Sequence, residues 1–183
     1  LDGMGKIAPL LDEAKRLGMD SIGITDHGSL YGSVEFVQEA NRRGIKPIIG
    51  VETYVARRGM HDKEGRADQQ PFHLVLLAAD DAGYRNLCRL VTDAHLEGMY
   101  YKPRIDLELL AKHSDGLIGL SACLNGEVAR ALEGDDWHYA VQTAGRYGDI
   151  FGKDRFYLEV QDHGLPEQRR SEEHTSELQS LRH

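Results

Sequence analysis

The sequence predicts an α/β fold in which strands and helices alternate along the chain. Short apolar segments rich in Ile, Val and Leu are typical of buried strands, and they separate longer segments whose apolar residues recur at helical spacing. Glycine follows several of the helical segments, where the end of a helix is expected. Alternation of this kind is typical of βαβ units, so we expect a mostly parallel sheet or a barrel.

The first half of the chain contains two expected helices and three expected strands. Residues 5–17 carry apolar residues at helical spacing and are followed by Gly18. Residues 30–43 repeat this pattern and are followed by Gly44. The polar, turn-rich residues 57–71 are expected to form a loop. The expected strands are residues 21–25, 46–56 (one strand or two short ones) and 73–79.

The second half continues the alternation with shorter elements. Asp80 or Asp81 is expected to cap a helix that continues to about Ala94. Residues 96–103 are expected to form an aromatic loop. The remaining expected elements are a helix at 106–113, a strand at 116–122, a short helix from Asn125, a helix at 135–148 and a strand at 156–160.

Composition excludes several classes of protein. The net charge is −8, and the longest apolar run, Leu74–Ala79, has six residues, whereas a membrane-spanning helix needs roughly 20. A secretory signal consists of a basic segment followed by an apolar one, and we find no such pair of segments in this sequence. Two cysteines do not make a disulfide framework, so we expect a cytoplasmic protein with no membrane partner. The acidic charge also implies that this chain alone supplies little affinity for nucleic acid.

The two ends of the sequence differ from its body. Residues 170–183 resemble the translation of a sequencing-adapter oligonucleotide, so we expect a non-native, disordered tail and a domain that covers residues 1–169. The alternative is a polar natural tail. Because the chain opens at Leu1 without Met, we also expect natural sequence upstream of it.

Polar side chains gather where the expected strands end. They are Asp26, His27, Glu52, Cys123, Asp162 and His163. In α/β barrels the active site lies at the carboxyl ends of the strands, so we expect a site there. His73 departs from this pattern because it opens its strand. Either that strand runs antiparallel to its neighbours or the barrel is distorted at this point.

These side chains are the donors that hydrolytic metal sites use. Carboxylates can bridge two cations, and imidazoles and thiolates hold zinc-like or manganese-like ions, which lower the pKa of a bound water. Each residue also has an alternative role. His27 would cap the next helix, and Glu52 would face solvent from an edge strand, although an unpaired buried carboxylate is costly. His73 would be a core histidine and Cys123 an ordinary buried thiol.

Two further sets of residues are singled out by their chemistry. Lys102 and Arg104 lie in a Tyr-Tyr-Lys-Pro-Arg segment, which could contact a phosphate or a stacked base. The alternative is an aromatic lid with solvated charges. Four histidines lie in expected loops or helices without a partner at useful spacing and are interpreted as surface or packing residues: His61, His95, His113 and His138.

Seven segments of the body, taken in order, carry a family resemblance. They are residues 1–3 (Leu-Asp-Gly), 24–28 (Ile-Thr-Asp-His-Gly), 44–52 (Gly-Ile-Lys-Pro-Ile-Ile-Gly-Val-Glu), 72–78 (Phe-His-Leu-Val-Leu-Leu-Ala), 97–106, 117–124 and 160–170. Together they resemble the polymerase and histidinol phosphatase (PHP) domain family. The Tyr-Tyr-Lys-Pro-Arg-Ile-Asp and Asp-His-Gly-Leu-Pro-Glu-Gln blocks resemble the branch found in bacterial DNA polymerase III alpha subunits more than the free-standing phosphatases.

The resemblance implies an α/β fold of PHP type, a partial distorted (β/α)7 barrel that is incomplete at both ends. It places five residues on metal-ligand positions: Asp2, His27, Glu52, His73 and Cys123. The family's remaining ligands, an initial His-x-His and a late Asp-x-His, would precede Leu1 and follow Arg170. Asp162 and His163 belong to a block without ligands. We therefore expect one metal to be retained weakly, a multi-metal centre to be incomplete and the isolated chain to be inactive.

The resemblance also implies a function. The expected parent is a replicative DNA polymerase, whose partners are DNA, deoxynucleoside triphosphates and other replisome subunits, including a proofreading subunit. Its expected cofactors are divalent metal ions, zinc or manganese in this domain and magnesium for polymerisation. In some members the domain is a metal-dependent 3′–5′ exonuclease. The alternatives are a free-standing phosphoesterase, such as a histidinol-phosphate phosphatase, and a non-catalytic replisome scaffold. No residue of the polymerase catalytic site is expected in this chain.

Overall fold

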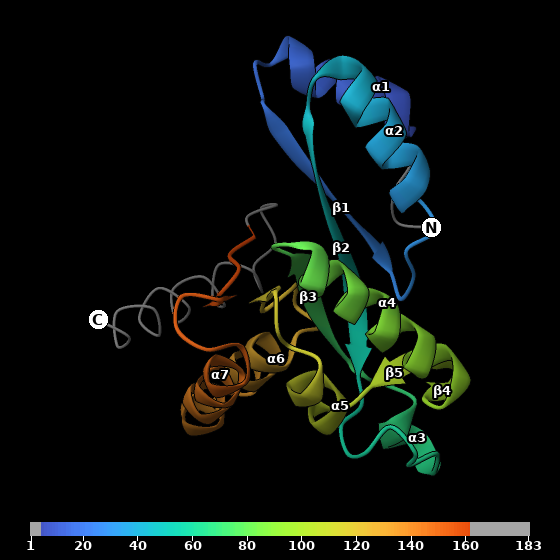
Figure 1. The fold of residues 1–183 in the computed structure, drawn as a ribbon. Helices are drawn as coiled ribbons and strands as arrows, with labels where there is room; N and C mark the ends of the chain where they lie inside the picture. The colour runs from blue at the N-terminus through green and yellow to red at the C-terminus, as the bar shows by residue number, and fades with distance from the viewer. Residues whose placement is uncertain (1–4, 162–183) are drawn as a thin grey trace.

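The computed structural model describes residues 5–161, which form a mixed sheet with helices packed around it (Figure 1). The strands are β1 (Ser21–His27), β2 (Lys46–Val55), β3 (Phe72–Ala78), β4 (Met99–Tyr100), β5 (Lys102–Ile105), β6 (Leu117–Leu120) and β7 (Phe156–Tyr157). The helices are α1 (Ile7–Arg16), α2 (Ser33–Arg43), α3 (Gly65–Asp68), α4 (Asp81–Leu96), α5 (Leu107–Lys112), α6 (Glu127–Glu133) and α7 (Trp137–Phe151). Within these residues, no helix has both the length and the apolar character that a membrane span requires.

Some of the sequence-based expectations concern residues beyond this described part. Asp2, the block with Asp162 and His163, and the tail at 170–183 all lie outside residues 5–161. The expectations for them remain predictions.

The long strand β2 holds the sheet together. It pairs in parallel with β1, whose last residue His27 lies opposite Glu52. Its second half pairs with the antiparallel strand β3, and its last residues, Tyr54 and Val55, also pair in parallel with β5. The strand β3 occupies one edge of β2. The strands β1 and β5 therefore both pair with the other edge, β1 along its first part and β5 at its end.

The rest of the sheet continues from β3 through β6 to β7. The strand β3 is antiparallel to both β2 and β6, whereas β6 and β7 are parallel. This confirms one of the two explanations for His73, that its strand runs antiparallel, and corrects the expectation of a mostly parallel sheet. The described strands form an open sheet that ends at β4 and β7, consistent with a partial barrel.

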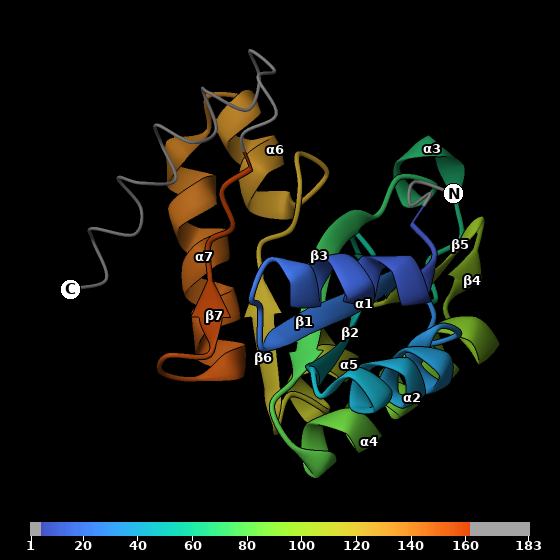
Figure 2. The same cartoon turned by 90° about the horizontal axis from the view of Figure 1, so that it is seen from above.

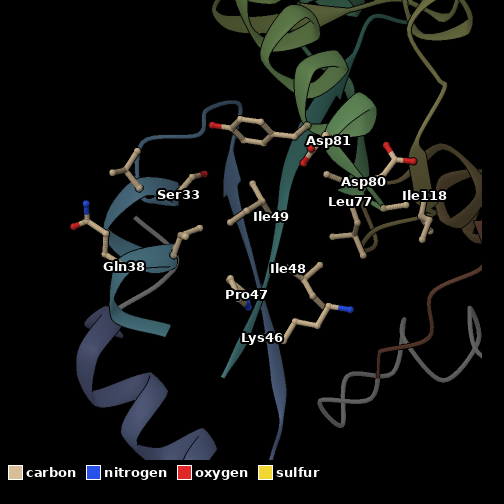
Figure 3. A pocket seen from close by; sticks show the side chains of 15 residues that line it. Ser33, Gln38, Lys46, Pro47, Ile48, Ile49, Leu77, Asp80, Asp81 and Ile118 are labelled. Carbon is tan, nitrogen blue, oxygen red and sulfur yellow. The ribbon is translucent and has the colours of Figure 1, made fainter. Parts of the chain in front are cut away.

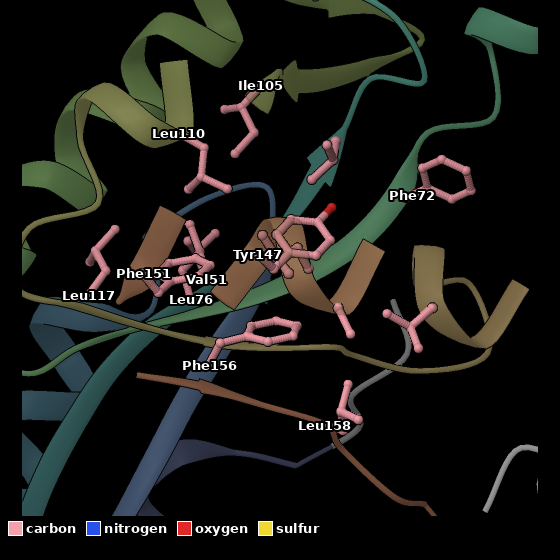
Figure 4. Packing of buried hydrophobic residues seen from close by; sticks show 14 of the residues in the cluster. Val51, Phe72, Leu76, Ile105, Leu110, Leu117, Tyr147, Phe151, Phe156 and Leu158 are labelled. Atoms are coloured by element: carbon pink, nitrogen blue, oxygen red, sulfur yellow. The ribbon is translucent and has the colours of Figure 1, made fainter. Parts of the chain in front are cut away.

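Two apolar clusters hold the helices against the sheet. The smaller cluster joins α1 and α2 and consists of Leu11, Ala14, Phe36, Ala40 and Ile45. The larger cluster lies between the sheet and helices α4 to α7. In it the ring of Phe156 stacks on those of Tyr147 and Phe151, with centroid distances of 5.2 and 5.9 Å (Figure 4). Seen from above, α6 and α7 lie on one side of the molecule and β4 and β5 on the other (Figure 2).

Two expected loops contain regular structure. Residues 57–71 include the short helix α3, and residues 96–103 contain β4 and part of β5, which form a hairpin. The hairpin was not predicted because its segment lacks the Asn-Gly or Asp-Gly pair that marks tight hairpins. It contains instead Pro103, which is disfavoured inside strands. Pairing of β5 with the end of β2, a contact distant in sequence, compensates for this local preference.

The structure also corrects the expectation that Arg104 contacts a phosphate. This side chain is 0% exposed, and its guanidinium donates hydrogen bonds only to backbone carbonyls. Nε reaches Gly98 at 3.2 Å, Nη1 reaches Asp68 at 3.1 Å, and Nη2 reaches Met60 and Asp62 at 2.9 and 3.0 Å. Buried backbone carbonyl groups need donors, and the fork of Arg104 satisfies several at once. Arg104 therefore fastens the loop after β2 to α4 and β5.

We expect the substitution Arg104→Met to lower the free energy of unfolding by about 3 kcal/mol or more, because it leaves several buried carbonyls without donors. Urea denaturation followed by circular dichroism measures this change. The control is Arg85→Met at an exposed position of α4, where a change within about 0.5 kcal/mol is expected. Equal effects of the two substitutions would contradict the role of Arg104.

Candidate metal centre

The pairing of three strands brings His27, Glu52 and His73 onto one face of the sheet. His27 is the cross-strand neighbour of Glu52 in the parallel pair of β1 and β2. His73 lies opposite Tyr54 in the antiparallel pair of β2 and β3. Because side chains alternate along a strand, Glu52 and Tyr54 point to the same side. The three ligand-type residues are therefore neighbours although they are far apart in sequence.

The ligand atoms of these residues all lie within 4.8 Å of one another. The Nδ1 atom of His73 is 2.6 Å from Oε1 of Glu52, and Nδ1 of His27 is 3.4 Å from Oε2 of the same carboxylate. The side chains of Glu52 and His73 are 16% and 17% exposed, whereas that of His27 is 36% exposed. The cluster thus has a half-buried floor and one side that is open to solvent.

Cys123 completes this group from the loop between β6 and α6. Its Sγ atom lies 3.6 Å from Nδ1 of His73 and 3.9 Å from Oε1 of Glu52. The N–H of His73 donates to the carbonyl of Asn125 at 3.0 Å, so the cysteine loop is attached directly to β3. The structure therefore brings together four of the five residues that the family resemblance assigned as ligands, and the fifth, Asp2, lies outside the described residues.

His27, Glu52 and His73 lie close enough together to share one divalent cation, and Cys123 adjoins Glu52 and His73. Two ligands of a tetrahedral zinc ion lie roughly 3.3 to 3.7 Å apart, given bond lengths of about 2.0 to 2.3 Å, and two of the separations above fall in this range. Burial disfavours the charged imidazole of His73, but the neighbouring Cys123 and Glu52 outweigh it and raise the pKa of His73 to about 9. A cation would therefore replace a proton that His73 shares with these neighbours.

The turn after His27 is tightly packed. Gly28 has a φ of 61°, and a Cβ atom there would lie 2.8 Å from Cγ of Pro103 and 3.0 Å from the ring of Tyr54. The N–H of Gly28 donates to the carbonyl of Glu52, and Nε2 of His95 donates to the carbonyl of Gly28 at 2.8 Å. His95, which was interpreted as a surface or packing residue, thus has a structural role in this turn. These contacts hold in place the turn that follows His27.

A polar network around the buried carboxylate of Glu127 lies next to the cysteine loop. Glu127, the first residue of α6, is 6% exposed and accepts hydrogen bonds from Tyr139 Oη, Arg146 Nη2 and Tyr147 Oη at 2.5, 2.7 and 3.0 Å. Burial, reinforced by the Glu127 carboxylate, raises the pKa of Tyr147 well above its usual value. The network anchors the start of α6 on α7 and so supports the loop that carries Cys123. Sequence analysis missed it because its members have no regular spacing.

Two more residues, Tyr54 and Lys102, lie beside the centre. Tyr54 was not singled out, yet its ring packs edge-on to that of His73 at 5.2 Å and parallel to that of His27 at 6.2 Å. The two-residue period of a strand would have placed Tyr54 on the same face as Glu52. Lys102 is exposed, and its Nζ atom lies 5.3 Å from the centroid of the Tyr54 ring.

A groove of about 780 Å³ lies at the other end of β2. Figure 3 shows Ile48, Leu77 and Ile118 among its lining side chains, between α2 and α4. The lining is mainly apolar and contains neither histidine nor cysteine. This groove is therefore separate from the candidate metal centre, which lies where β1 ends.

Clustered histidine, carboxylate and thiol groups at strand ends of an α/β sheet are typical of metal-dependent hydrolases. The PHP domain family matches residues 1–163 of this chain. The chain therefore belongs to the PHP domain family.

Among known proteins, the chain is similar to DNA polymerase III subunit alpha from two bacteria. It is 43% identical to that of Treponema pallidum over 171 residues and 47% identical to that of Thermus aquaticus over 174 residues. Each match covers 93% of this chain but only 15% and 14% of the relative, so the chain spans about one seventh of their length. A solved structure from Bifidobacterium adolescentis, described as a candidate metal-dependent phosphoesterase, shares the fold, with a TM-score of 0.51 and 12% identity over 97% of this chain and 80% of that one.

We expect Gly28→Ala to weaken binding of cobalt(II), used as a spectroscopic probe, by about tenfold, because the added methyl group would displace the turn that directs His27. The matched control is Gly44→Ala. Gly44 has a similar φ of 69° but open space around it, so both variants carry a backbone strain of about 1 kcal/mol and only the first disturbs the centre. Equal cobalt affinities in the two variants would show that packing at Gly28 has no influence on the centre.

Proposed function

We propose that His27, Glu52, His73 and Cys123 bind a divalent cation and that, within a longer protein, this centre takes part in the hydrolysis of phosphate esters. The observation that carries this proposal is the convergence of these four donors from three strands and one loop, with a separation of only 3.6 Å between the His73 and Cys123 ligand atoms. When bound, the cation supplies Lewis acidity that activates water and stabilises charge on phosphate oxygens. The thiol and imidazoles favour zinc, and the carboxylate also suits manganese.

The chain's own groups would divide the remaining work. The Glu52 carboxylate lies between the two imidazoles, one contact on each oxygen, and so holds both rings in place. His27 lies on the exposed side of the cluster, where a substrate phosphate would approach. Tyr54 packs against both imidazole rings and excludes water from one side of the centre.

The relatives extend the proposal to a longer protein. They are DNA polymerase III alpha subunits of which this chain spans about one seventh. The proposed parent extends a DNA primer with deoxynucleoside triphosphates and magnesium, and the PHP domain acts as a 3′–5′ proofreading exonuclease. Other replisome subunits, including a proofreading subunit, would then be its partners, and the cytoplasm its location.

A second candidate function is hydrolysis of small phosphomonoesters, as by a histidinol-phosphate phosphatase. The net charge of −8 favours it, because an acidic chain repels a polynucleotide more than a small ester. A non-catalytic scaffold is the remaining alternative, and it shares the metal centre but not the hydrolysis.

We expect cobalt(II) to bind the full chain with a thiolate-to-metal charge-transfer band, because Cys123 lies among the donors. Cys123→Ser should abolish the band and weaken binding by at least about tenfold. Cys88→Ser is the control: Cys88 lies on α4 and is not part of the donor cluster. A band that persists in Cys123→Ser and disappears in Cys88→Ser would contradict the proposed ligand set.

For the hydrolytic function, we expect Glu52→Gln in the full-length protein to reduce 3′–5′ hydrolysis of DNA by about 100-fold, because both imidazoles lose their common carboxylate partner. Primer extension should remain unchanged, and Glu35→Gln at an exposed position of α2 should affect neither activity. Hydrolysis of small phosphomonoesters without hydrolysis of DNA would support the second candidate. Metal binding without any hydrolysis would show a scaffold.

A further inference from the structure

The tip of the β4–β5 hairpin is an exposed and strained tyrosine. Tyr100 pairs with Lys102, so Tyr101 alone forms the turn. Its φ is 58°, and the residue is 72% exposed. A bulky residue at positive φ is uncommon and costs about 1 to 2 kcal/mol. Strain of this kind is concentrated at functional sites.

The base of the hairpin is rigid, so the tip is held in position. The ring of Tyr100 packs edge-on to that of Tyr101 with a centroid distance of 4.9 Å. The guanidinium of Arg104 lies 5.2 Å from the centroid of the same Tyr100 ring, and it is itself fixed by its hydrogen bonds to backbone carbonyls. An exposed aromatic ring on such a support can stack on a flat ligand at a small cost in conformational entropy.

The hairpin also connects directly to the candidate metal centre. Lys102 places its ammonium 5.3 Å from the ring of Tyr54, and Tyr54 in turn packs on the rings of His27 and His73. One aromatic ring therefore separates the exposed ammonium group from two of the proposed ligands. The exposed ring of Tyr101 and the ammonium group of Lys102 are therefore neighbours on the hairpin, and Lys102 is the one nearer to the metal centre.

We propose that the tip of the β4–β5 hairpin binds single-stranded polynucleotide, with Tyr101 stacking on a base and Lys102 neutralising a phosphate beside the one at the metal centre. This inference rests on the proposed function and specifies its substrate. A small phosphomonoester would need only the metal centre, whereas a polynucleotide offers both a base and an additional phosphate to the hairpin. Aromatic stacking contributes about 1 to 3 kcal/mol per base, which matters in a chain whose net charge of −8 opposes nucleic-acid binding.

The test measures binding of a fluorescein-labelled oligodeoxythymidylate to the full chain by fluorescence anisotropy at low salt. We expect Tyr101→Ala to raise the dissociation constant about tenfold and Tyr101→Trp to leave it unchanged or lower it. Lys102→Ala should weaken binding and reduce the slope of log affinity against log salt by about one. Tyr84→Ala and Lys46→Ala are the controls, because both residues line the groove at the opposite end of the sheet.

Cobalt(II) binding, measured on the unchanged chain and on Cys123→Ser, distinguishes failure of the hairpin proposal from failure of the proposed metal centre. If Tyr101→Ala binds the oligonucleotide like the unchanged chain, or if the chain does not bind it at all, the hairpin inference is overturned; the metal-dependent function then stands as long as cobalt binding depends on Cys123. The hairpin would in that case be available as a contact for another protein. If Tyr101→Ala weakens oligonucleotide binding while cobalt binding is independent of Cys123, the hairpin site is supported and the proposed metal centre is contradicted.

Discussion

The pairing register of β2 with its two neighbours is the constraint on which the rest of the structure depends. A slip of one residue would turn Glu52 to the opposite face of the sheet, away from both histidines. The observed register places His27 beside Glu52 and His73 two positions further along the same face. It also leaves the last residues of β2 free of β1, and β5 pairs there. The metal centre and the adjacent hairpin therefore both follow from one strand.

A half-buried group of one carboxylate, two imidazoles and a thiol is costly unless its charges are compensated. In the metal-free protein the compensation comes from the pair between Glu52 and His73, since the raised pKa of the imidazole keeps a positive charge beside the carboxylate. A divalent cation would supply that positive charge instead. The backbone around the donors is held by the close packing at Gly28 on one side and by the Glu127 network on the other.

Lys102 and Arg104 show where sequence-based prediction reaches its limit. Both are cations in the same short segment, and sequence analysis gave them the same role. The structure separates them because residues of the 57–71 loop fold over Arg104 and bind its guanidinium through their carbonyls, whereas Lys102 stays exposed beside Tyr54. No local pattern indicates which cation a loop some 40 residues away in sequence will cover, because that loop has no regular periodicity of its own.

The sequence by itself determined the alternation of strands and helices, the types of donor at the strand ends and the family to which the chain belongs, because these depend on local composition, spacing and motifs. Only the tertiary structure decided that β3 runs antiparallel, which brings the start of that strand to the ends of β1 and β2 and so carries His73 to Glu52. It likewise decided the roles of Tyr54, His95 and Glu127. The physical reason is the same in each case: these roles arise from contacts between segments distant in the chain, and such contacts form only when the sheet and its helices assemble.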